Sequence, residues 1–246
     1  MSPRLLEVAG VSRAFGGLQA VQDLSLSVEE GEVVGIIGPN GAGKTTAFNF
    51  VSGFLPPDAG DIRLRGRSIR GLPPHAICAR GLARTFQIVR PFPRLSVLDN
   101  VKVGALARHP RVADARARAG EVVDRVGLGP KALVPAGGLT LADRKRLELA
   151  RALATEPVLL LLDEVMAGLT ATETTAIVEL VTGINRSGVS ILLIEHNMRA
   201  VMALSHRVIV LSFGQKIAEG PPAAVVIDPR VIEAYLGEEY VHAAQG

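Results

Sequence analysis

The chain has 246 residues, of which 48% are hydrophobic, so it can bury one large core or a core with a subdomain. Its net charge of +3 is too even to indicate a nucleic-acid partner, and none is expected. The apolar runs are far shorter than the ~18 residues of a membrane span, so we expect neither a transmembrane segment nor, from the N-terminal pattern, a signal peptide. A single cysteine, Cys78, excludes an internal disulfide and fits a reducing cytosol.

The first strong motif follows an apolar, β-branched run at residues 33–37, which predicts a buried strand. After this run, every fixed position of the pattern G-x-x-x-x-G-K-[ST] is filled, and a helical stretch follows at residues 45–51. We predict that the loop binds nucleotide phosphates through its backbone N–H groups, with Lys44 at the β- and γ-phosphates and the Thr45 hydroxyl on Mg²⁺. The residues of this phosphate-binding loop are Gly38, Pro39, Asn40, Gly41, Ala42, Gly43, Lys44, Thr45 and Thr46.

Further along, short apolar runs alternate with helical segments, as a parallel sheet with crossover helices requires. These runs lie at residues 158–162, 191–194 and 208–211. Residues 24–28 and 62–65 instead alternate apolar with polar side chains, which predicts half-exposed antiparallel strands in a small second sheet. The pattern therefore predicts an α/β fold with a parallel core sheet and a small antiparallel β-subdomain.

Residues 91–155 are helical in pattern and rich in Arg and Ala, without a convincing buried strand. We interpret them as a helical subdomain. Residues 1–90 and 156–246 then form the nucleotide-binding core with the small β-sheet. The last helix of the subdomain is predicted to begin after Thr140, which serves as its N-cap.

Acidic side chains follow the strand predicted at residues 158–162. Asp163 and Glu164 come directly after it, at the carboxyl end where ligands of an open α/β sheet bind. Asp163 suits the coordination shell of Mg²⁺, and Glu164 can polarise a water for in-line attack on the γ-phosphate. His196 follows the next strand, so we expect it at the same edge as a γ-phosphate contact.

Together these motifs resemble the ATP-binding subunits of ABC transporters along the whole chain. The resemblance assigns the phosphate-binding loop to Walker A, residues 159–164 to Walker B and His196 to the switch histidine. It places Phe15 where an aromatic ring stacks on adenine, and Gln87 in the Q-loop, with a part in Mg²⁺ binding and catalysis. It places Thr140 in the signature segment, and implies that the Thr140 hydroxyl contacts the γ-phosphate bound by the other subunit of a dimer. The implied fold is that of a P-loop ATPase, with ATP and Mg²⁺ as cofactors.

Four short strings narrow this resemblance to the LivG-like subunits that serve branched-chain amino acid uptake. They lie at residues 15–18, 81–87, 195–198 and 234–237. The resemblance implies ATP hydrolysis coupled to import at the cytoplasmic face of the cell membrane. The implied partners are a second ATP-binding subunit, identical or related, transmembrane permease subunits and, indirectly, a periplasmic or extracellular substrate-binding protein. The substrate rests on resemblance alone, because this kind of subunit does not touch the transported molecule.

Other classes of protein with a phosphate-binding loop fit less well. A non-transport ABC ATPase that clamps nucleic acid or ribosomes carries two cassettes, long coiled coils or extra domains, and 246 residues hold none of these. A GTPase would carry an Asn-Lys-x-Asp motif, which this sequence lacks. A small-molecule kinase would not need the signature segment or the switch histidine. The clamp is the alternative that remains.

Two positions depart from the family's usual pattern. The signature segment reads Leu-Thr-Leu-Ala-Asp at residues 139–143, where Leu-Ser-Gly-Gly-Gln or Leu-Ser-Tyr-Gly-Gln is usual. Ala142 adds a methyl group where the backbone approaches a ligand closely, and Asp143 adds a negative charge. The three basic residues after Asp143 are candidates to offset that charge, so we expect reduced or retuned activity. Thr170 stands where the family commonly has Asp, which affects communication between subunits.

Overall fold

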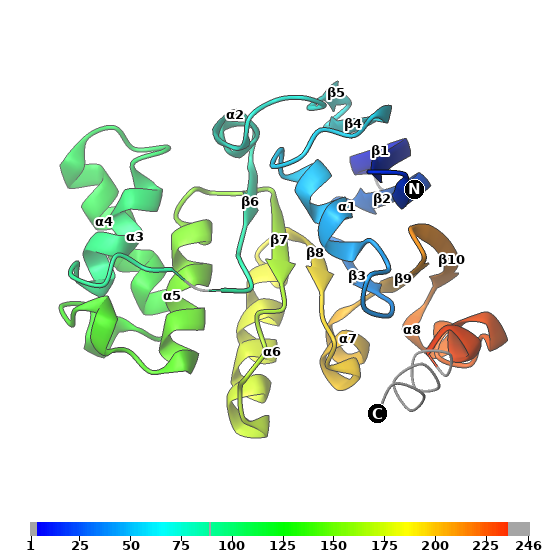
Figure 1. Cartoon of the computed structure of the whole chain (residues 1–246). Coiled ribbons are helices and arrows are strands. Elements are labelled where there is room, and N and C mark those ends of the chain that lie inside the picture. Colours follow the sequence, from blue (N-terminus) through cyan, green and yellow to red (C-terminus); the bar gives the residue numbers. More distant parts are fainter. Residues whose placement is uncertain (1–3, 89, 236–246) are drawn as a thin grey trace. The chain divides into compact units, whose positions relative to one another are not determined.

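The computed structural model describes residues 4–88 and 90–235. The described residues fall into two compact units. The first unit comprises residues up to Pro74 and from Ser190 onward, and the second comprises His75–Val189 (Figure 1). Residues 236 and 237, which end the last of the four family-like strings, lie outside the described residues.

The first unit contains the small antiparallel sheet that the alternating pattern predicts. Its strand order is β2-β1-β4-β5. Leu24, Leu26 and Val28 are buried on one face of β2, while Ser25 between them is exposed, which confirms the predicted alternation. The strands are β1 (Arg4–Phe15), β2 (Leu18–Glu29), β4 (Ala59–Leu64) and β5 (Arg67–Ser68).

The first unit also contains the parallel strands around the phosphate-binding loop. Their order is β10-β9-β3-β8, with β3 parallel to both β8 and β9, and β10 antiparallel to β9. Every residue of β3 and β8 is buried, as predicted for strands covered on both faces. The strands are β3 (Val33–Ile37), β8 (Ser190–Ile194), β9 (Arg207–Ser212) and β10 (Gln215–Gly220), and the helices are α1 (Lys44–Val51), α7 (Met198–Leu204) and α8 (Pro222–Val225).

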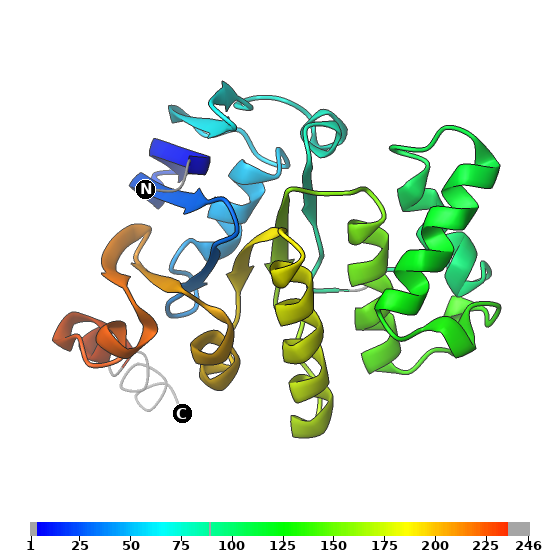
Figure 2. The ribbon, with the colours of Figure 1, turned by 180° about the vertical axis from the view of Figure 1, so that it is seen from behind.

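The second unit pairs two parallel strands, β6 and β7, and is otherwise helical. Among the described residues of 91–155 there is no strand, only an isolated bridge between Ser96 and Pro135, in line with the helical pattern. Figure 2 shows the green helices of this segment packed side by side. The strands are β6 (Leu82–Arg84) and β7 (Leu159–Asp163), and the helices are α2 (Pro74–Ala79), α3 (Val97–Ala105), α4 (Val112–Arg125), α5 (Leu141–Leu153) and α6 (Ala171–Arg186), with 3-10 turns η1 (Gly129–Lys131) and η2 (Ala136–Gly138).

Helix α5 begins where the sequence predicts. The Thr140 side chain accepts a hydrogen bond from the backbone N–H of Asp143, which satisfies a donor that the first helical turn leaves without a partner. The helix buries Leu147, Ala150 and Leu153. Across the described residues, the helices are too short or too polar to cross a membrane.

Candidate nucleotide-binding and catalytic site

The phosphate-binding loop is held in shape by its lysine and by a glycine. Lys44 is 7% exposed, and its ammonium group donates to the carbonyl oxygens of Gly38 at 2.6 Å and Pro39 at 2.8 Å. Gly38 has a positive φ of 147°, and a Cβ atom there would lie 2.1 Å from the carbonyl oxygen of Leu211. Only glycine fits this position, so the sequence constrains the loop to pass close to the end of β9.

Helix α1 begins directly after the loop. Its N-cap is Gly43, with φ of 96° and no capping side chain, and its first turn contains no acidic residue. The first N–H groups of a helix lack partners within the helix and carry its positive dipole end, so this terminus favours an anion. Thr45, one residue into the helix, is exposed and offers its hydroxyl at the same place, while Thr46 is half-buried.

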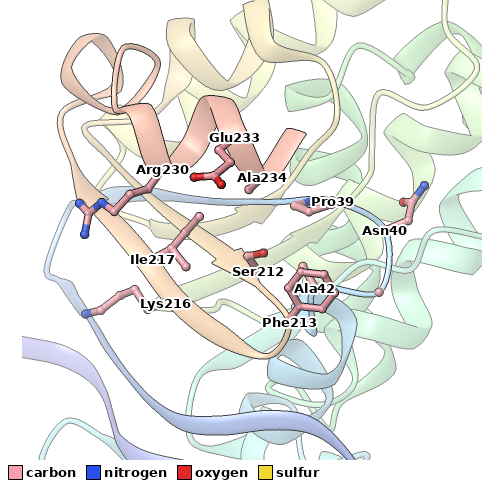
Figure 3. A pocket seen from close by; sticks show the side chains of 11 residues that line it. Pro39, Asn40, Ala42, Ser212, Phe213, Lys216, Ile217, Arg230, Glu233 and Ala234 are labelled. Carbon is pink, nitrogen blue, oxygen red and sulfur yellow. The ribbon is translucent and has the colours of Figure 1, made fainter. Parts of the chain in front are cut away.

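The loop also borders a pocket of about 810 Å³ in the first unit. Figure 3 shows the loop residues on one side of this pocket and Arg230 and Lys216 on the other. The volume lies in the range of small-molecule sites. The pocket is lined by Pro39, Asn40, Gly41, Ala42, Ser212, Phe213, Lys216, Ile217, Arg230, Glu233 and Ala234.

His196 lies at the same sheet edge as the phosphate-binding loop. Strands β3 and β8 are parallel, with Ile36 opposite Ile194, so Gly38 and His196 each follow their paired strand residue by two positions. The His196 side chain is exposed, whereas Glu195 before it is buried. The histidine thus lies at the sheet edge where the sequence predicts it, and its contact with a γ-phosphate stays a prediction.

Phe15 ends β1 and is 46% exposed. The guanidinium carbon of Arg13 lies 5.2 Å from the ring centroid, and Asp58 holds this guanidinium at 2.6 Å. The exposed ring is suited to stacking on a planar ligand. A base that stacks on the face near Arg13 would have to displace that guanidinium.

In the second unit, Asp163 ends β7 and is 4% exposed. Its Oδ2 accepts a hydrogen bond of 2.7 Å from Arg84, and both side chains are buried. Its backbone N–H donates to the Thr85 hydroxyl at 3.2 Å. The sequence reasoning missed Arg84. The sequence feature that could have indicated Arg84 is its position at the end of β6, because the carboxyl ends of two paired parallel strands lie side by side.

Gln87 and Glu164, predicted separately from the sequence, are in direct contact. The Gln87 side-chain amide donates to Glu164 Oε2 at 2.6 Å, and Glu164 has a positive φ of 48°, which is uncommon for a residue with a side chain. Lys145, 3% exposed on α5, donates to the backbone carbonyls of Gln87 at 3.3 Å and Glu164 at 3.0 Å. A buried ammonium group thus ties together the two loops that carry the candidate catalytic pair. No local sequence signal indicates this role of Lys145.

The extra charge of Asp143 has a partner that the sequence reasoning did not identify. Asp143 Oδ2 accepts from the Thr140 hydroxyl at 2.9 Å and forms an ion pair with Lys131. Burial alone would raise the pKa of the Asp143 carboxyl, but the hydrogen bonds from Lys131 and Thr140 and the charges of Lys131 and Arg146 lower it below its usual value. Arg146, one of the three basic residues that follow Asp143, acts on the carboxylate through space. The direct contact comes from Lys131, which lies outside the signature segment.

Comparison with known proteins identifies the family. The ABC transporter family pattern matches residues 21–167, and that of the branched-chain amino acid ATP-binding cassette transporter matches residues 215–241. The chain is 42% identical to the high-affinity branched-chain amino acid transport ATP-binding protein LivG of Salmonella typhimurium, and 41% identical to BraF of Pseudomonas aeruginosa, described in the same words. Each alignment covers 97% of this chain and 100% of the relative.

The fold leads to the same family. The chain matches a solved ABC transporter ATP-binding cassette in its ADP conformation with a TM-score of 0.88 and 29% sequence identity, covering 96% of this chain and 100% of that one. The chain belongs to the ABC transporter family, as an ATP-binding cassette with the P-loop ATPase fold. The sequence prediction of fold and ATPase class is confirmed.

Proposed function

We propose that this ATPase drives the import of branched-chain or related amino acids. The observation that carries the proposal is the similarity of 41–42% identity over 97% of the chain to transport subunits of that substrate class, reinforced by the separate match at residues 215–241. These relatives favour transport over the nucleic-acid or ribosome clamp. The cargo would not touch this chain, because the cassette spends ATP on conformational change in its partners.

The geometry supports specific roles for the predicted site residues. Glu164 acts as the general base toward the attacking water, and the Gln87 amide, 2.6 Å from its carboxylate, orients it. His196 contacts the γ-phosphate, and Phe15 stacks on adenine. The residues of the phosphate-binding loop bind the phosphates, with Lys44 as their cation. Thr140 meets the γ-phosphate of ATP on a facing cassette.

The proposed Mg²⁺ ligands fit a hard cation. Thr45, Gln87 and Asp163 offer a hydroxyl, an amide and a carboxylate oxygen, which is the donor chemistry that Mg²⁺ prefers. Among residues 4–88 and 90–235, no group of three or more His, Cys, Asp and Glu side chains could hold a metal ion. When bound, the ion neutralises charge on the β- and γ-phosphates. The chain's own contribution is to hold Asp163 in place through Arg84.

The proposed assembly has two ATP-binding subunits, identical or related, docked on transmembrane permease subunits. A periplasmic or extracellular substrate-binding protein would deliver cargo to the permeases. The cassette would then be peripheral, on the cytoplasmic face of the cell membrane. Each ATP would lie between the phosphate-binding loop of one cassette and the signature segment of the other.

Uptake in the source organism tests the proposed transport. We expect a strain without this chain to lose most high-affinity uptake of radiolabelled leucine, and wild-type protein to restore it. The Glu164→Gln variant should be produced at the same level and fail to restore uptake. This result would show that uptake requires ATP hydrolysis and not merely the presence of the subunit. Uptake of a sugar serves as the control for membrane energisation. Undiminished leucine, isoleucine and valine uptake in the strain without the chain would contradict the proposal.

A further inference from the structure

The start of α5 contains three side chains that form one connected group. The Thr140 hydroxyl accepts from the Asp143 N–H at 3.2 Å and donates to Asp143 Oδ2 at 2.9 Å, so its single proton is directed at the carboxylate. The same oxygen is paired with the ammonium group of Lys131, which ends η1 twelve positions earlier in the chain. The position and charge of Asp143 therefore depend on Lys131.

Neither Arg144 nor Lys145 replaces Lys131, and Arg146 acts on Asp143 through its charge. Arg144 donates to the Gly137 carbonyl at 3.0 Å, and the ammonium group of Lys145 lies on the carbonyls of two other loops. Within the described part of the chain, Lys131 is the cation in an ion pair with Asp143. The Lys131 side chain is 46% exposed and that of Asp143 14%, so the carboxylate lies inside and the cation faces solvent.

We propose that Lys131 is a positioning residue of the signature segment, which cancels the charge of Asp143 and fixes it against Thr140 so that the segment can approach the γ-phosphate of a facing cassette. The proposal rests on the proposed function, because it assumes ATP-driven pairing of two cassettes. Without Lys131, the carboxylate would lose its ion pair and present more negative charge to an anionic ligand, although the charge of Arg146 would still act on it through space. Repulsion of this kind weakens as salt screens it. The negative charge that Asp143 adds to the signature segment is thus offset by Lys131, which lies outside that segment.

Removal of one charge, followed by removal of both, tests the pair. The protein concentration for half-maximal ATP-driven association with the partner cassette is measured by sedimentation at two salt concentrations, in a Glu164→Gln background that retains ATP. We expect Lys131→Ala to weaken association about fivefold to tenfold, and less at high salt, from like-charge repulsion in a partly solvated setting. Lys131→Arg should keep parental association. Lys131→Ala with Asp143→Gln should return it to within about twofold of the parent, because both charges are gone.

The controls separate this role from a structural one. Each variant should keep the parental circular dichroism spectrum and ATP affinity of the separate subunit, since the phosphate-binding loop is unchanged. A purely structural role would give a loss that salt does not change and that the second substitution does not restore. Such a result would overturn the positioning role of Lys131. So would a Lys131→Ala variant that associates as strongly as the parent. A parent that does not associate with ATP overturns the paired-cassette mechanism, and the proposal with it.

Discussion

Lys145 has a positioning role in the structure that its place in the sequence does not indicate. Its buried ammonium group holds the backbone carbonyls of Gln87 and Glu164, and thereby the geometry of the proposed base. Lys145→Met should lower kcat about 100-fold, the cost of displacing a catalytic group by about 1 Å, and leave ATP affinity nearly unchanged. Steady-state kinetics and equilibrium ATP titration check this split. A parallel loss of ATP affinity, or an unchanged kcat, would contradict the positioning role.

Glu148 predicts a pH dependence of stability. Its burial raises the pKa of the carboxyl above the usual 4.5, although the Phe86 N–H and the charges of Lys145 and Arg151 oppose the shift. A raised pKa in the folded state means that the native protein binds the proton more tightly than the unfolded chain. The stabilisation is complete below about pH 4.5 and is lost as the pH rises through the folded-state value.

Glu148→Gln removes this titration while keeping an acceptor for the Phe86 N–H. We expect the variant's free energy of unfolding, relative to wild type, to increase from pH 4.5 to pH 8. Urea unfolding at several pH values measures this. Glu179→Gln, on an exposed position of α6, is the matched control. A difference between variant and wild type that is constant with pH would show that Glu148 is not the responsible group.

At the scale of elements, the sequence predicts what local patterns encode. Strand β3 has the predicted bounds, because an uninterrupted apolar run between turn residues is a strong signal. Strand β1 was missed, since its pairing with β2 contains irregularities that interrupt the alternation of buried and exposed residues. The contacts of Lys131, Arg84 and Lys145 were missed as well, because they join residues from 12 to 79 positions apart. Whether residues 91–155 act as a separate subdomain stays a prediction.

The cap of α5 gives a prediction at this scale. Thr140→Ala should lower the free energy of unfolding by about 1 kcal/mol, because the Asp143 N–H loses its acceptor. Thr140→Ser keeps the hydroxyl and should lose much less. Chemical denaturation of both variants measures the difference. Equal stabilities would show that the capping bond does not hold the start of the helix.

At the scale of the whole molecule, different residues are proposed to bind ATP and to hydrolyse it. Lys44 belongs to the loop that binds phosphates, so Lys44→Ala should abolish tight ATP binding. Circular dichroism should remain unchanged, because the two bonds described above join the lysine to carbonyls of the loop itself. Equilibrium titration with ATP measures the loss. Wild-type affinity in this variant would mean that the loop is only a turn.

The ATP turnover of Glu164→Gln, at saturating ATP and with the partner subunits present, tests directly whether Glu164 is the general base. The amide keeps the size of the carboxylate but cannot accept a proton from water, and loss of a general base typically costs on the order of 10²- to 10⁴-fold. We expect a loss of this size together with wild-type ATP affinity and accumulation of ATP-bound dimers. Turnover at the wild-type rate would contradict this expectation and assign the proton transfer to another residue.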